Sequence, residues 1–132
     1  MKGLIIITTA IVSICITVSC SHKSYMTNGE MIYRRGRNLD GRPLLDKSNS
    51  QIRIIKSCQG CHGETGDRMR NCNIKWSQLS DPGKISVIYN DSLFARFLDK
   101  DIKSDGTPAQ TGVHWNMTQR EKKDLVEFLK SL

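Results

Sequence analysis

The sequence predicts an all-α protein, and two local signals and one absence support that fold class. At two places a threonine is followed three residues later by a glutamate, in Thr27–Glu30 and in Thr118–Glu121. This capping-box pattern marks the start of a helix because each side chain can satisfy a free backbone N–H group. No segment alternates apolar and polar residues convincingly, apart from the weak run Gln51–Ile55, so no sheet is expected.

The first expected helix runs from about residue 28 to 35. Met31, Ile32 and Tyr33 follow the Thr27 cap and give the helix an apolar side. Gly36 is expected to end it, because glycine readily adopts the left-handed conformation found just after helix ends. The residues that follow, 38–50, contain Asp-Gly, a proline and a Ser-Asn-Ser run, which are turn signals.

Two further helices are expected in the second half of the chain. Asn90 or Asp91 can cap the first of them. Its buried face consists of Leu93, Phe94, Phe97 and Leu98. Residues 101–112 are rich in Gly, Pro, Ser, Thr and Asp and predict a loop. The closing helix follows Thr118 and carries one apolar stripe, formed by Leu125, Phe128, Leu129 and Leu132.

The N-terminal residues have the pattern of an export signal. Lys2 precedes an uncharged, mostly apolar run, Leu4 to Val18, which is short for a membrane-spanning helix but fits a signal-peptide core. The run ends at Val18-Ser19-Cys20, which resembles a bacterial lipoprotein signal, where cleavage precedes the cysteine and lipid is attached to its sulfur. We expect residues 1–19 to be a lipoprotein-type signal peptide and 20–27 a tether; an uncleaved N-terminal anchor is the alternative. Both place the remaining chain outside the cytoplasm, facing the periplasm and attached to a membrane.

Composition limits what kind of protein follows this signal. The chain has 132 residues, a formal net charge of +7 and five cysteines, with charged residues at 25% and apolar residues at 38%. These values exclude a disordered chain, a fibre and a polytopic membrane protein. Five cysteines cannot all pair within one chain, which argues against a disulfide scaffold. Aromatic residues make up only 6%, so a group other than protein is a candidate for filling part of the core.

The residues that carry specific chemistry are Cys58-Gln59-Gly60-Cys61-His62. On a helical turn, residues three apart lie on one face, so the two thiols can form thioether bonds with the two vinyl groups of one haem. His62 follows directly, and its imidazole can bind the iron from one side. The pattern therefore predicts one covalently bound haem c, attached through Cys58 and Cys61, with His62 as proximal iron ligand.

These residues have two other possible uses. A Cys-x-x-Cys pair can be a redox disulfide, but such proteins place it in a βαβ context, which this sequence lacks. Cys58, Cys61, His62 and Cys72 are also a possible zinc ligand set. That set usually includes a second Cys-x-x-Cys pair, which is missing. Haem attachment takes place outside the bacterial cytoplasm, and this agrees with the export signal.

Residues 28–132 resemble a monohaem, class I-type cytochrome c. The resemblance rests on the haem motif, on Gly29 and Tyr33 in the first helix, and on Phe128-Leu129 in the last. It implies a small fold of about four short helices around the haem, with the first and last helices crossing at a glycine and an aromatic residue. One departure is an insertion, residues 34–57, between the first helix and the haem motif. We expect it to form a loop or small hairpin over the haem edge.

The second departure concerns the sixth iron ligand. The family supplies a methionine before the last helix, where this chain has Gly112-Val113-His114-Trp115. Three possibilities remain open: Met117 binds, His114 binds, or the position is open or filled by Met69 or Cys72. An iron held by one methionine and one histidine has a raised reduction potential, whereas an open sixth position permits ligand binding.

The resemblance implies a function in electron transfer, with the iron cycling between Fe(II) and Fe(III) and no substrate chemistry of the protein's own. Expected partners are redox proteins that bind transiently, with the membrane reached through Cys20 or the anchor and the chain monomeric outside any complex. Nucleic-acid binding is not expected. The alternatives are a haem-based ligand sensor with an open sixth site and an electron-entry subunit of a larger oxidoreductase.

Overall fold

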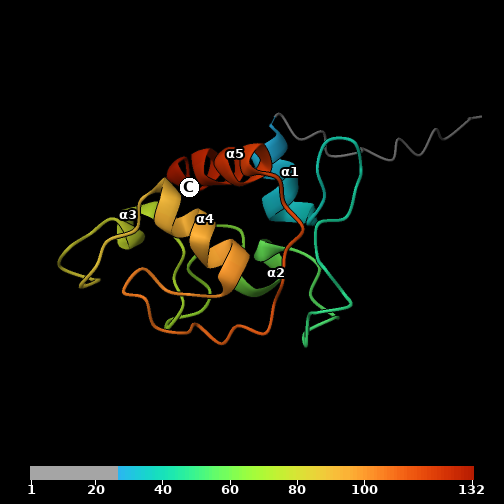
Figure 1. Cartoon of the computed structure of the whole chain (residues 1–132). Helices are drawn as coiled ribbons and strands as arrows, with labels where there is room; N and C mark the ends of the chain where they lie inside the picture. Colours follow the sequence, from blue (N-terminus) through green and yellow to red (C-terminus); the bar gives the residue numbers. More distant parts are fainter. Residues whose placement is uncertain (1–26) are drawn as a thin grey trace, which may run out of the picture.

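The computed structural model describes residues 27–132, and the expected signal peptide, the lipid site Cys20 and most of the tether lie outside them. The described chain forms five helices: α1 (Asn28–Arg35), α2 (Cys58–His62), α3 (Trp76–Leu79), α4 (Asp91–Lys100) and α5 (Gln119–Lys130). Figure 1 shows them joined by long loops. Within residues 27–132 the only β-type pairings are three isolated bridges. The prediction of an all-α fold is therefore confirmed.

Helix α1 has the predicted bounds and the predicted caps. The hydroxyl of Thr27 accepts a hydrogen bond from the Glu30 backbone N–H, and Gly36 adopts the left-handed conformation with φ 63°. Only half of the expected capping box forms, because the Glu30 carboxylate accepts from Arg34 Nε at 3.0 Å. The i,i+4 ion pair thus takes the place of the reciprocal cap.

Helix α5 begins with the complete capping box that the sequence predicts. Thr118 Oγ1 accepts from the Glu121 N–H, and Glu121 Oε2 accepts from the Thr118 N–H at 2.8 Å. The buried side chains of this helix include Leu125, Val126 and Leu129. Leu132, which the sequence placed on the apolar stripe, lies two residues beyond the helix end and is half-buried.

Helices α3 and α4 differ in how well the sequence predicts them. The side chain of Asn90 caps α4 by accepting from the Leu93 N–H at 2.8 Å, as one of the two predicted caps. Helix α3 was not predicted. It has only four residues and its N-cap, Lys75, makes no side-chain cap, so no start signal marks it in the sequence.

The first and last helices pack against each other at a glycine, as expected. A Cβ atom placed on Gly29 would overlap the backbone carbonyl of Asp124 and come within 2.9 Å of Phe128 Cβ. One turn along α1, the ring of Tyr33 lies 5.3 Å from that of Phe128. Figure 1 shows α1 and α5 together at one end of the molecule. The absent side chain at Gly29 is what allows this close approach.

The inserted loop begins at Gly36, since Arg34 and Arg35 belong to α1. It is held to the segment before α5 at several points. Leu45 forms an isolated bridge with Trp115, and the His114 backbone N–H donates to Ser50 Oγ at 2.9 Å. These bonds bring the loop and the segment before α5 side by side on one edge of the molecule.

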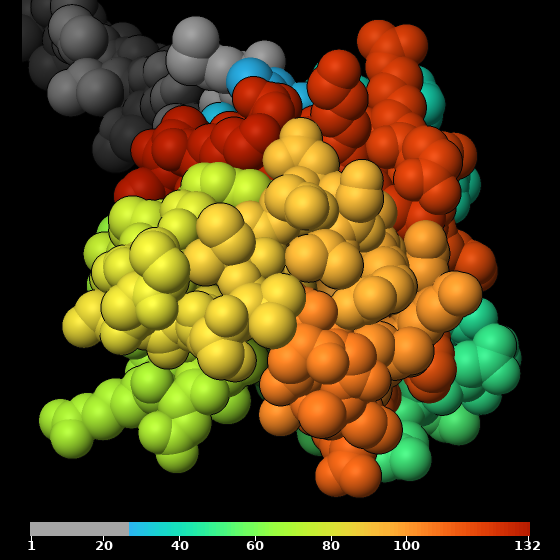
Figure 2. Space-filling model, turned by 60° about the vertical axis from the view of Figure 1, so that its left-hand side comes forward, coloured from blue at the N-terminus to red at the C-terminus, as the bar shows by residue number. Residues whose placement is uncertain are grey.

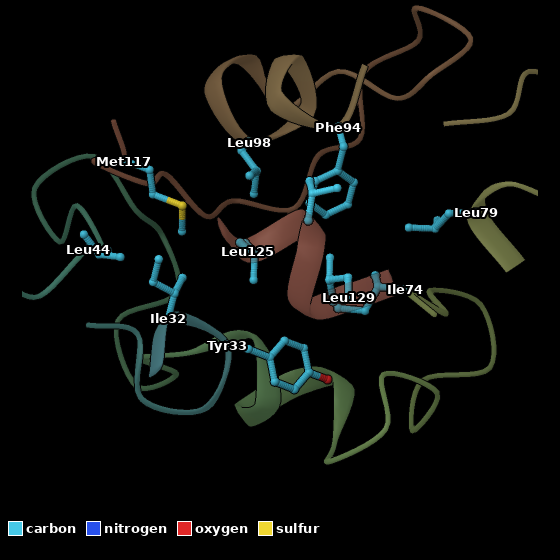
Figure 3. Close-up of a cluster of buried hydrophobic side chains, with 11 residues drawn as sticks. Ile32, Tyr33, Leu44, Ile74, Leu79, Phe94, Leu98, Met117, Leu125 and Leu129 are labelled. Atoms are coloured by element: carbon cyan, nitrogen blue, oxygen red, sulfur yellow. The ribbon is translucent and has the colours of Figure 1, made fainter. Parts of the chain in front are cut away.

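The hydrophobic core lies between α1, α4 and α5, and Figure 3 shows its buried side chains. Met117 belongs to this cluster, where its sulfur is directed toward Ile32. Leu44, from the inserted loop, is also fully buried in it. The loop is therefore an integral part of the core and not an appendage.

Candidate functional site

Helix α2 is a single turn that carries Cys58, Cys61 and His62. The turn ends at Gly63, whose φ of 77° and ψ of −172° lie in a region open to glycine alone, and whose N–H donates to the Gln59 carbonyl. Because the helix has only five residues, both cysteines and the histidine sit on one short, well-defined stretch of backbone. The prediction that a helical turn carries the motif is confirmed.

All three side chains line one apolar cavity of about 370 Å³. The volume is within the range of small-molecule and cofactor sites. Most of the remaining wall is apolar. It comprises Ile52, Ile55, Met69, Ile74, Phe94, Phe97, Leu98, Ala109, Val113, Trp115, Leu125 and Leu129. Figure 2 shows α4 and the loop after it forming one continuous face of the molecule, with residues 77–90 beside them.

The imidazole of His62 has a fixed tautomer. Its Nδ1 lies 2.9 Å from the backbone carbonyl oxygen of Cys72. A carbonyl only accepts, so Nδ1 carries the proton and Nε2 keeps a free lone pair. Burial lowers the pKa of His62, a hydrogen bond to the Cys72 carbonyl opposes the shift, and the nearby Arg68 adds to it. The ring is therefore neutral at pH 7, which is the form that binds metals.

The two cysteines of the motif are free, partly buried thiols. Burial raises the pKa of Cys58 to about 12. Redox-active Cys-x-x-Cys pairs have a lowered thiol pKa instead. Cys58 does not have that property. Within residues 27–132 no group of three or more His, Cys, Asp or Glu side chains is arranged to hold a metal ion.

The residues present fit a covalently attached haem. Two thiols three residues apart, followed by an imidazole with a free Nε2, face a cavity whose wall is largely apolar. This donor set matches what thioether attachment and proximal iron ligation need. A Cβ atom on Gly60 would come within 2.7 Å of the side chain of Ile55, which also lines the cavity. The glycine therefore makes room for Ile55 beside the turn.

The candidate sixth ligands fall into two groups. Met117 is buried in the core cluster and does not line the cavity. His114 has an exposed side chain and does not line it either. Met69 and Cys72 both do. The structure thus brings Cys58, Cys61 and His62 together and leaves the two favoured sixth-ligand candidates outside the cavity.

Three residues of the site had no clear signal in the sequence. Arg68 donates from Nε to the Cys61 carbonyl at 3.1 Å and from its second terminal nitrogen to the Gly60 carbonyl, which satisfies acceptors at the end of α2. The Tyr33 hydroxyl donates to the Gly63 carbonyl at 2.7 Å. Gln110 lines the cavity with a φ of 56°, which a sequence does not reveal for a non-glycine residue.

Two arginines near the start of the inserted loop, Arg34 and Arg42, are engaged within the molecule. Arg34 pairs with Glu30 and lies over the Phe128 ring, and Arg42 donates two hydrogen bonds to Glu121. These residues tie α1 and the loop to their neighbours.

No helix among residues 27–132 has the length and apolar character needed to cross a membrane. Comparison of the chain with protein families, with curated proteins and with solved structures finds no match in any of the three. The geometry of the α2 cavity therefore carries the functional argument alone.

Proposed function

We propose that this protein is an exported, membrane-tethered electron carrier with one covalently bound haem c. The observation that carries the proposal is the convergence of Cys58, Cys61 and His62 from one helical turn onto the wall of one apolar cavity.

Each residue has a defined part in this function. Cys58 and Cys61 hold the haem covalently, and His62 provides Nε2 to the iron while the Cys72 carbonyl holds Nδ1. The bound group supplies one-electron chemistry, the exchange between Fe(II) and Fe(III). The apolar side chains around it, such as Phe94 and Leu98, exclude water. This raises the free energy of the more highly charged Fe(III) state and so raises the reduction potential.

The fold keeps this turn rigid. The Tyr33 hydroxyl and the Arg68 guanidinium bind carbonyls at the end of α2, and Tyr33 is itself packed on Phe128 of α5. Helix α1 thus contacts the motif turn through Tyr33, and α5 supports it through the packing of Phe128 on the Tyr33 ring. A rigid site suits electron transfer, because the ligands need little rearrangement between the two iron states.

The location is inferred from the N-terminal signal, and the partners are inferred from the proposed electron transfer. Cys20 is proposed to carry lipid, which places the protein at a membrane outside the cytoplasm. Electron carriers bind their partners briefly through small interfaces, and the net charge of +7 favours partners with acidic docking surfaces.

The decisive test is covalent haem attachment in cells that contain a c-type maturation system. The full chain is expressed, extracted from membranes, and denatured on a gel stained for haem. The wild-type protein is expected to keep its haem, Cys58→Ser and Cys61→Ser each to keep one thioether, and the double variant to lose the covalent haem. Cys72→Ser is the matched control, because Cys72 is a free thiol at the same cavity outside the motif. A wild-type protein without covalent haem would refute the proposal.

Electron transfer itself is tested by potentiometric titration of the holoprotein. The haem spectrum is expected to convert reversibly between two states with a one-electron slope. Irreversible conversion or loss of haem on reduction would argue against a carrier.

A second candidate, a haem protein that binds a small ligand, is favoured by one observation. Met117 and His114 both lie outside the cavity, so neither is positioned to occupy the sixth coordination site.

A further inference from the structure

The segment between α4 and α5 supplies one wall of the cavity but no methionine or histidine side chain to it. From this segment the lining residues are Ala109, Gln110, Thr111, Val113 and Trp115. Of their side chains, those of Gln110, Thr111 and Trp115 carry uncharged groups that can donate a hydrogen bond. The Thr111 hydroxyl is already used, since it donates to Asp101 Oδ1 at 2.7 Å.

Met117 is held away from the cavity by the start of α5. It is buried among core residues with its sulfur directed toward Ile32 (Figure 3). It directly precedes the N-cap Thr118, whose box with Glu121 is complete. Turning Met117 into the cavity would withdraw its side chain from the core and leave a hole there, which costs about 1 kcal/mol or more.

His114 is held by its backbone. Its N–H donates to Ser50 Oγ at 2.9 Å, and its carbonyl accepts from the Asp46 N–H at 2.9 Å. The side chain that this backbone presents is exposed and outside the cavity. The inserted loop thus holds the His114 backbone while the side chain lies outside the cavity.

Cys72 and Met69 come from the loop that supports His62. The Cys72 carbonyl accepts from His62 Nδ1, so this residue stands beside the imidazole, on the side where the proximal ligand enters. Met69 is in the same turn, because its carbonyl accepts from the Cys72 N–H at 3.1 Å. If His62 held the iron of a bound haem, a ligand opposite to it would come from a part of the cavity wall other than this loop.

Gln110 combines a costly backbone conformation with a free side chain at the cavity. Its φ of 56° is one of two positive values at non-glycine residues within 27–132. The neighbours on both sides are clamped to Asp101: the Ala109 N–H donates to its carbonyl and the Thr111 N–H to its carboxylate, both at 2.8 Å. The Gln110 amide has no hydrogen-bond partner among the described residues. A glycine would adopt this conformation at a lower cost in free energy. The presence of glutamine here therefore suggests that its side chain has a use at the cavity.

We propose that the haem has an exchangeable axial position on the side of residues 109–115, and that the Gln110 amide donates a hydrogen bond to a small neutral diatomic ligand bound there. This inference rests on the haem function proposed above. In this proposal Gln110 contacts the bound ligand, while Met117 serves in the core, His114 lies at the surface, and neither binds the iron.

The experiment uses the purified holoprotein and carbon monoxide as the probe. Covalent haem is first measured by gel staining, which tests the proposed function separately. The reduced wild-type protein is then expected to bind carbon monoxide fully, with the change in the haem absorption spectrum as readout. A protein with stained haem that stays low-spin and does not bind carbon monoxide would overturn the inference while leaving the carrier function intact; a protein without haem overturns both.

Variants separate the ligand role of Gln110 from its backbone role. Gln110→Ala and Gln110→Gly are both expected to bind carbon monoxide, to release it about two- to tenfold faster, and to raise the C–O stretching frequency, because a hydrogen bond is lost. The glycine variant also relieves the positive φ, so equal release rates in the two variants would show that the amide is responsible. Unchanged rate and frequency in both would refute the role of Gln110.

Matched variants test the excluded ligands. Met117→Leu keeps the core filled and removes the sulfur, and His114→Ala removes an exposed ring. Both are expected to leave the spectrum and the carbon monoxide affinity of the wild type unchanged. Met69→Leu is expected to do the same. If any of these converts a low-spin spectrum to a high-spin one, that residue is the sixth ligand and the inference is wrong.

Discussion

His62 and Cys72 are joined by a hydrogen bond from the imidazole Nδ1 to a backbone carbonyl, 2.9 Å long. The bond fixes the orientation of the ring without using the Cys72 thiol. Burial raises the pKa of that thiol, so it stays protonated near neutral pH. What residue 72 contributes to the site is thus a backbone acceptor, and many side chains at this position would leave the imidazole in place.

Arg68 is expected to stabilise the motif turn through its contacts with α2. Replacing Arg68 by Ala removes donors from the Cys61 and Gly60 carbonyls, and because the side chain is exposed, the loss in unfolding free energy should be about 1 kcal/mol. It also removes a positive charge near His62, so the reduction potential of the holoprotein should fall. Urea unfolding and potentiometric titration measure the two effects.

The control for this prediction is Arg70→Ala, two residues along the same loop. Arg70 is exposed and loses the same charge, but makes no bond to α2. Both variants should lower the potential, but only Arg68→Ala should lower stability. Equal stability of the two variants would show that the contacts to α2 contribute nothing.

Tyr33 is expected to link the terminal helices to the haem motif through its hydroxyl. Burial raises the pKa of Tyr33 to about 12, so the group stays a donor to the Gly63 carbonyl throughout the neutral range. Tyr33→Phe keeps the ring packed on Phe128 and loses only this bond, which should cost about 1 kcal/mol in thermal or urea unfolding. Tyr33→Leu, which also loses the ring contact, should cost more; equal losses would mean that the hydroxyl bond is without effect.

The Gly29 contact predicts a large effect for a small substitution. Gly29→Ala gains up to about 1 kcal/mol of helix propensity, but the added methyl group overlaps the Asp124 backbone, which cannot move away cheaply. Forcing α1 and α5 apart should cost about 1–3 kcal/mol net and lower the melting temperature. Gly83→Ala is the control, since its nearest neighbour there is the flexible Asp81 carboxylate, and it should melt like the wild type.

The sequence predicts those parts of the fold that depend on local signals. The caps Thr27, Asn90 and Thr118 mark the starts of α1, α4 and α5, because a cap is a bond between residues two or three apart. The close contact at Gly29 could be expected from the resemblance of the terminal helices. The motif turn follows from the spacing of Cys58 and Cys61.

Contacts between distant segments could not be predicted in the same way. Whether Met117 or His114 faces the cavity depends on how the inserted loop docks, through bonds such as Ser50 to His114, which are 64 residues apart in the chain. The left-handed conformation of Gln110 depends on the Asp101 clamp. No local pattern encodes either, because both are set by tertiary hydrogen bonds.

Glu121 is expected to be a main determinant of acid stability. Its buried carboxylate accepts from Arg42, Asn38 and Thr118, at 2.7 to 2.9 Å. It therefore joins the α5 cap to the inserted loop. Glu121→Ala should cost about 2–3 kcal/mol, because it leaves the buried Asn38 amide and part of the cap without an acceptor, while the half-exposed Arg42 remains solvated. Glu127→Ala, an exposed glutamate on the same helix, should cost less than about 0.5 kcal/mol.

The pH dependence tests the same carboxylate. Burial raises the pKa of Glu121, but the hydrogen bonds from Thr118, Asn38 and Arg42 outweigh it, so the pKa lies below the usual 4.5. The folded state thus holds this proton less tightly than the unfolded state, and the stability gained is present above about pH 4.5 and is lost as the pH falls through the folded pKa. Glu121→Gln should be less stable than the wild type at pH 7, and the difference should shrink between pH 4.5 and pH 3. Urea unfolding at each pH measures it; a difference that stays constant with pH would show that the ionised carboxylate contributes no more than a neutral amide.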